Sequence, residues 1–173
     1  MLKEEQTILA LDTATHCGYA VYKNGKVITA GVWNLDRKDN GVTNRYGTLY
    51  DRIQATIERY KITHIVKEDV YLDTTSHKKD NAFKVLCELA GVVKLVAFDY
   101  NVTITNIETR QMQRFMFSRL AQRFDAKQAM CNQITQLGYT LPSTHKDDMA
   151  DALGLLFTYI GKTIQYQPNN SRI

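Results

Sequence analysis

The residues most suited to chemistry are acids at the start of the last apolar helical stretch of the chain. Asp148 and Asp151 are three residues apart, so a helix would place both carboxylates on one face. Neighbouring carboxylates repel each other unless a cation lies between them, and their oxygens suit Mg²⁺ or Mn²⁺. The alternative is an exposed first helical turn, where acids favour the helix dipole. Asp147, which points about 100° away from Asp148, fits that alternative better.

Two further acids end predicted strands. The apolar run over residues 7–11 predicts a buried strand that ends in Asp12, and residues 63–68 predict a strand that ends in Glu68. If these strands are adjacent and parallel, both carboxylates project from the same end of the sheet, where open α/β sheets place their sites. An exposed strand terminus is the alternative for Glu68.

The rest of the pattern supplies the elements that would position these acids. Asn24-Gly25 separates two strand-like segments and predicts a hairpin, so the chain opens with an antiparallel meander of three strands. Helical periodicity then alternates with two more strands, and three helices follow. The predicted strands cover residues 7–11, 17–23, 26–33, 63–68 and 102–107; the predicted helices cover 42–60, 82–98, 108–122, 125–137 and 147–162.

Four residues near the expected site have simple structural interpretations. In the fourth strand, His64 is interpreted as a strand-surface residue and Lys67 as an outward-facing one. Gly18 either permits a close approach of backbone near Asp12 or marks a plain junction between turn and strand. His145 is interpreted as a residue of the loop before the last helix.

Length and composition limit the class of protein. A chain of 173 residues predicts one domain, taken as residues 1–164, with residues 165–173 as a disordered tail. The apolar fraction of 44% is ordinary for a globular protein, and no apolar run is long enough to span a membrane. No signal peptide precedes the first strand, so we expect a soluble protein of the cytoplasm. The three cysteines lack CxxC spacing and indicate neither a disulfide framework nor a zinc site.

The charge distribution is more informative than the net charge of +4. Residues 75–130 contain nine basic and five acidic side chains. A mildly basic middle beside an acidic metal site is the balance that a nuclease needs. For most of these residues taken singly, an ordinary solvated face is the alternative.

The order of elements and acids resembles the ribonuclease H-like nuclease fold and, within it, the RuvC family of Holliday junction resolvases, particularly its phage-type members. Ile8–Asp12 followed by Gly18–Val21 resembles the family's first motif, and Val66–Tyr71 resembles its strand-ending glutamate with an aromatic three residues later. Asp148–Leu153 is similar to the terminal acidic motif. The resemblance implies an α/β fold in which a five-stranded mixed sheet, with a three-stranded antiparallel meander plus two parallel strands, is flanked by helices.

The resemblance also implies an activity. The chain would be a metal-dependent endonuclease that cuts four-way junctions and related branched DNA by paired nicks, in the cytoplasm of a bacterium or a phage-infected host cell. Asp12, Glu68, Asp148 and Asp151 would bind Mg²⁺, with Mn²⁺ as a substitute, and Lys127 would stabilise the charge of the transition state. Residues 82–92 resemble the helix that carries the family's homodimer interface. The implied DNA-binding residues are Tyr71, Lys78, Lys79, Arg110, Arg114 and Arg119.

Three other functions fit parts of the pattern. A nuclease of the same fold could act on RNA, which would need a contact to the ribose hydroxyl. A non-catalytic nucleic-acid-binding module is disfavoured because all four acids are present. Asp12–Thr15 superficially resembles the phosphate loop of an actin-type ATPase, but the chain is short for two such domains and lacks phosphate-cradling glycines.

Overall fold

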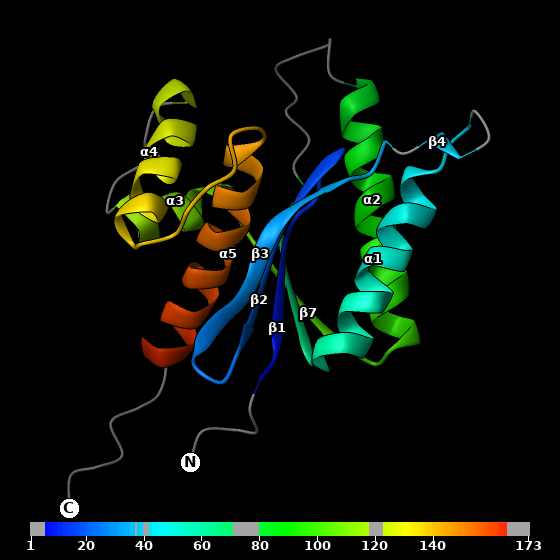
Figure 1. Cartoon of the computed structure of the whole chain (residues 1–173), viewed down its shortest axis with the longest axis horizontal. Coiled ribbons are helices and arrows are strands. Elements are labelled where there is room, and N and C mark those ends of the chain that lie inside the picture. Colours follow the sequence, from blue (N-terminus) through cyan, green and yellow to red (C-terminus); the bar gives the residue numbers. More distant parts are fainter. Residues whose placement is uncertain (1–5, 37, 40–41, 71–79, 118–122, 166–173) are drawn as a thin grey trace, which may run out of the picture.

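The computed structural model describes residues 6–36, 38–39, 42–70, 80–117 and 123–165. A mixed sheet lies between two helical layers, with α1 and α2 on one side and α3, α4 and α5 on the other (Figure 1). The strands are β1 (Ile8–Asp12), β2 (His16–Lys23), β3 (Lys26–Asn34), β4 (Lys38–Asp39), β5 (Val42–Thr43), β6 (His64–Glu68) and β7 (Thr103–Ile107). The helices are α1 (Arg45–Tyr60), α2 (Asp80–Asp99), α3 (Thr109–Phe117), α4 (Arg123–Gln136) and α5 (Lys146–Gln165).

The five strands of the main sheet run in the order β3-β2-β1-β6-β7. β1, β2 and β3 form an antiparallel meander, while β6 pairs parallel with β1 and β7 pairs parallel with β6. The predicted mixed sheet is therefore confirmed. Asn24 and Gly25 both have positive φ, 52° and 80°, as the tight turn between β2 and β3 requires.

The predicted element boundaries differ from the structure in a few places. The short pair β4–β5 was not predicted, because two-residue strands carry no periodicity. The last helix reaches Gln165, three residues beyond its predicted end, and the remainder of the predicted tail lies outside the described residues. Gly138 follows α4 with φ 91°, the left-handed conformation expected after a helix end.

The two faces of the sheet bury different sets of side chains. Leu9, Leu11 and Ile65 belong to the core under α1 and α2, whereas Ala10 and Val66 belong to the core under α3, α4 and α5. Because strand side chains alternate between faces, the acids that end β1 and β6 fall on the α5 side.

Two interpretations of β6 were wrong. His64 is only 8% exposed: its ring stacks on Tyr159 of α5 at 4.7 Å, and its Nε2 lies 2.9 Å from the Thr105 hydroxyl. Lys67 is 2% exposed, and its Nζ donates to the Glu68 carbonyl at 3.0 Å. Both errors have one cause, since helices cover both faces of this central strand and leave it no outward side.

Candidate active site

The strand register brings Asp12 and Glu68 to the same edge of the sheet. β1 and β6 are parallel neighbours, with Leu11 opposite Lys67, so the residue that follows each of these is an acid at the end of its strand. This confirms the adjacency on which the sequence argument depended. The site therefore starts from two carboxylates that a parallel strand pair holds side by side.

Gly18 lets the acidic helix reach that edge. In the antiparallel pairing of β1 with β2, Gly18 lies opposite Asp12. A Cβ atom built on Gly18 would lie 1.8 Å from the carbonyl oxygen of Asp148, so only glycine allows this contact between strand and helix backbone. The close approach left open from the sequence is confirmed, although its partner is the first turn of α5.

The four acids, which we call the acid cluster, sense one another's charge. Burial raises the pKa of Asp12 well above its usual range, and the charges of Asp151, Glu68 and Asp148 raise it further. Burial, followed by the charge of Glu68, raises the pKa of Asp151 to about 7. Burial is also the main cause of the raised pKa of Glu68 and of Asp148. The two strand-end acids and the two helix acids therefore lie within reach of one another's charge at the same end of the sheet.

Thr109 is a contact that sequence reasoning missed. Its hydroxyl, at the first residue of α3, donates to the carboxylate of Glu68 and thereby offsets part of the rise in the Glu68 pKa. A threonine at the start of a helix has many local uses, so nothing in the sequence pointed to a carboxylate on a strand 41 positions away. The bond fixes the orientation of one acid of the cluster.

Lys127 lies at the solvent side of the acid cluster. Its Nζ forms an ion pair with Asp147, and this pair raises the pKa of Lys127 and lowers that of Asp147. The Lys127 side chain remains 68% exposed, while its charge lowers the pKa of Asp12, Asp148 and Asp151. A cation thus lies within electrostatic reach of the acids, where the sequence predicted it, with Asp147 as an unforeseen partner.

Two histidines lie close to Asp148. The rings of His16 and His145 stack with their centroids 3.6 Å apart and their planes 16° from parallel. The Nδ1 atom of His145 is 3.5 Å from an Asp148 carboxylate oxygen. His145 does lie in the loop before α5, as interpreted, but its stacking on the first residue of β2 depends on the fold and left no signal in the sequence.

The donor set fits a divalent cation. Within the described ranges, no three His, Cys, Asp or Glu side chains already surround a common point closely enough to hold an ion. The four carboxylates nevertheless supply hard oxygen ligands and a mutual repulsion that a cation would relieve. Mg²⁺ commonly binds through one or two carboxylates and keeps several waters, so it needs no closed protein cage.

The remaining predicted site residues fall into two groups. Arg110 and Arg114 are exposed on α3, the helix whose first residue contacts Glu68. The others lie outside the described residues: Tyr71, Lys78, Lys79 and Arg119.

Comparison with known proteins gives a consistent result. The family model described as crossover junction endodeoxyribonuclease RuvC matches residues 8–159. RuvC of Thermus thermophilus, solved in complex with a Holliday junction substrate, is similar in structure with a TM-score of 0.71 and 15% identity, covering 93% of this chain and 97% of that one. The yeast mitochondrial Holliday junction resolvase Ydc2 gives a TM-score of 0.64 and 10% identity, covering 94% of this chain and 82% of the other. No protein of curated function matches the chain.

Proposed function

Because the chain belongs to the crossover junction endodeoxyribonuclease RuvC family, we propose that it resolves Holliday junctions and related branched DNA at the acid cluster. RuvC-family nucleases depend on divalent metal ions. The convergence of four carboxylates with raised pKa values is the observation that carries the proposal, since such a group is costly to the fold unless it binds a cation. We propose Mg²⁺ as the ion used, with Mn²⁺ as a substitute.

The residues of the site have separate roles in this proposal. Asp12, Glu68, Asp148 and Asp151 would hold the metal ions, which would supply an activated water and stabilise charge on the leaving oxygen. Thr109 keeps one acid in place through its hydrogen bond to Glu68. Lys127 leaves its ion pair with Asp147 and binds the scissile phosphate, where it stabilises the negative charge that develops in the transition state.

DNA binding and dimer formation would use other surfaces. The exposed Arg110 and Arg114 contact phosphates on the α3 side of the acid cluster, together with the basic residues at positions 78, 79 and 119, and Tyr71 stacks on bases at the junction centre. A homodimer is typical of the RuvC family. Here α2 presents Leu95, 54% exposed, and Phe98, 83% exposed, as the apolar surface for a second copy.

No helix in the described part of the chain is both long and apolar enough to span a bilayer. We propose that the protein acts on DNA in the cytoplasm of a bacterium or of a phage-infected cell.

Light scattering during size exclusion is expected to give the mass of a dimer. A wild-type protein that stays monomeric at micromolar concentration would contradict the dimer without affecting the acid cluster.

The function is tested by cleavage of a labelled mobile four-way junction beside a linear duplex, with Mg²⁺ and with Mn²⁺. We expect paired symmetric nicks in the junction, no cutting of the duplex, and no cutting of either by Asp148→Asn. Asp125→Asn, which removes an exposed acid from α4, is the matched control and should cut like the wild type. Tight junction binding without cleavage in either metal would instead indicate a binding module, and equal cutting of both substrates would indicate a nuclease without junction selectivity.

A further inference from the structure

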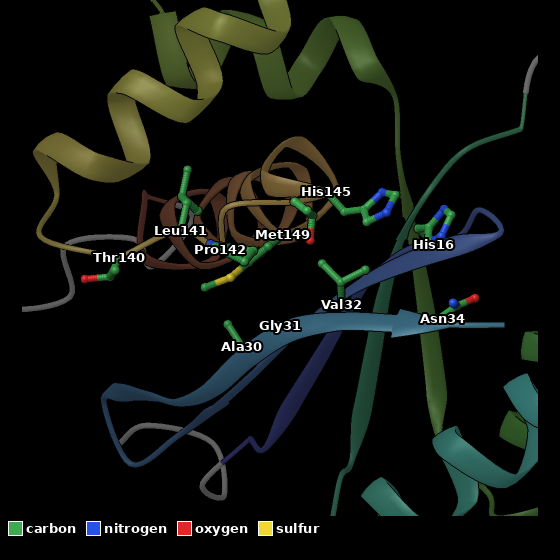
Figure 2. A pocket seen from close by; sticks show the side chains of 11 residues that line it. His16, Ala30, Gly31, Val32, Asn34, Thr140, Leu141, Pro142, His145 and Met149 are labelled. Carbon is green, nitrogen blue, oxygen red and sulfur yellow. The ribbon is translucent and has the colours of Figure 1, made fainter.

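A hollow of about 660 Å³ lies directly beside the acid cluster. It opens between β3 on one side and, on the other, the loop that leads into α5 together with the first turn of that helix. Its lining includes His145 and Met149, which lie on either side of Asp148 in the sequence. Figure 2 shows Val32 of β3 facing Met149 across the hollow, with Leu141 and Pro142 on the loop side. A molecule in this hollow would therefore lie beside Asp148, at one end of the acid cluster.

The end of the hollow nearest the acids is formed by aromatic planes. His16 and His145 lie together there (Figure 2), stacked at 3.6 Å. The His145 side chain is 44% exposed, and His16 is partly exposed, so the pair can be reached from the hollow and from solvent. Histidine rings are among the side chains on which nucleobases stack when they leave a helix.

The position of His145 is set by its backbone. It has φ 54°, a left-handed conformation that side-chain-bearing residues adopt rarely, immediately before α5 begins. The neighbouring contact between Gly18 and Asp148 holds the start of the helix against β2, the strand that begins with His16. The stacked pair is thus fixed to the same two elements that carry the acid cluster.

The chemistry of the walls distinguishes among ligands. Among the described residues that line the hollow there is no carboxylate, lysine or arginine, and the side chains that can carry a charge there are His16 and His145. The lining combines apolar contacts from Val32, Leu141 and Met149 with the hydroxyls of Thr140 and Thr144. Flat apolar faces with polar edges are the property of a nucleobase, and hydroxyls can donate to and accept from base edges. The volume lies within the range of pockets that hold small ligands.

We propose that this hollow receives a nucleobase of the strand being cut, one that flanks the scissile phosphate, and that its walls determine which sequences are cut. The proposal rests on the proposed nuclease function, because that function brings a DNA strand to the acid cluster. The backbone is held by the metal site and Lys127, while an unstacked base enters the hollow beside His16 and His145. Base readout outside the grooves of a duplex requires such an unstacking step.

The experiment uses junctions in which a fluorescent adenine analogue replaces each base around the cut in turn, measured on binding without a divalent metal. We expect one position beside the cut to brighten, because the analogue leaves the base stack. The same junctions with randomised bases at these positions, cut in Mg²⁺, give the sequence preference.

Two variants and one control make the test decisive. Val32→Trp fills the hollow, and His16→Ala removes one stacking ring; both should lose the fluorescence change and cut the preferred sequence about tenfold more slowly, with a flatter base preference at that position. Ile28→Trp places the same side chain at a 40% exposed position of β3 that does not line the hollow, and should behave like the wild type.

The two proposals can fail separately. If no position brightens in the wild type, or if both variants keep the signal and the base preference, the hollow does not hold a base. A wild type that brightens at one position but cuts no junction would instead support the base site and contradict the nuclease function.

Discussion

Helices cover both faces of the sheet, but the two faces bury different kinds of charged side chain. Under α1 and α2, the core is formed by residues such as Leu9, Leu11, Ile53 and Val93, and Lys67 is a buried lysine on this face. Under α5, an apolar core gives way at the strand ends to four partly buried acids. Burying one cation costs a local desolvation, whereas burying several carboxylates together adds repulsion to desolvation. Only the carboxylates would be stabilised by binding a cation. We therefore assign function to the α5 face and stability to the α1–α2 face.

The largest expected effect comes from removing Asp12, the acid that ends the middle strand β1. Asp12→Asn should lower junction cleavage on the order of 10³-fold, because a metal ligand contributes several kcal/mol to stabilising the transition state. Single-turnover cleavage in Mg²⁺ measures the loss, with Asp125→Asn as the exposed control. The same variant should be at least as stable as the wild type without metal. A variant that unfolds would show that the carboxylate stabilises the α5 face, contrary to the comparison.

The pH dependence of stability tests the repulsion itself. The pKa of Asp151 rises from 3.8 to about 7, so the folded protein binds more protons than the unfolded one between these values. Without metal, the free energy of unfolding should therefore fall as the pH rises from 4 to 7, by up to about 4 kcal/mol for this group. Thermal unfolding at pH 5 and pH 8 measures the fall.

Two controls identify the source of this pH effect. Mg²⁺ should restore stability at pH 8, where the carboxylates are charged, and have little effect at pH 5. Asp151→Asn should make the pH profile less steep, and Asp12, Glu68 and Asp148, whose pKa values are also raised, should account for the remaining slope. An unchanged profile in that variant would assign the effect to other groups.

A smaller effect is expected from disturbing the contact between β2 and the first turn of α5. Gly18→Ala places a Cβ atom against the Asp148 backbone and should cost about 1–3 kcal/mol, because neither backbone can yield without moving the acids. Urea unfolding measures this cost, and cleavage should fall with it. Gly91→Ala, at an exposed position of α2, is the control: nothing lies within 4 Å of its added Cβ, and it should be neutral or slightly stabilising.

Sequence reasoning assigned the four acids to the correct strands and helix, because each has a local signature. Asp12 and Glu68 ended apolar runs, and Asp148 and Asp151 had helical spacing, so each could be assigned to a strand end or a helix face. The contacts that complete the site join distant segments without local periodicity, as do Thr109 with Glu68 and His16 with His145. They follow from the packing of α3 and α5 on the sheet, which one sequence does not encode in any short pattern.

Lys67 shows why the same reasoning failed on the opposite face. A lysine in a strand is normally assigned to solvent, but β6 has helices on both sides, and the Lys67 side chain ends under α1 and α2. Burial lowers its pKa, which means that the charged form of Lys67 destabilises the folded state. Its Nζ donates to the carbonyl of Glu68, whose carboxylate lies on the other face.

Lys67→Met therefore sharpens the comparison by removing a buried charge from the α1–α2 face. We expect the free energy of unfolding at pH 7 to rise by about 1 kcal/mol, since the lost desolvation cost exceeds one hydrogen bond. Lys94→Met, at an exposed site on α2, should change stability by less than about 0.5 kcal/mol. Cleavage by Lys67→Met should stay within a few fold of the wild type, because the acids keep their own side of the sheet. A clear loss of cleavage with stability unchanged would mean that the lysine positions Glu68 through its carbonyl, and that the two faces act together in catalysis.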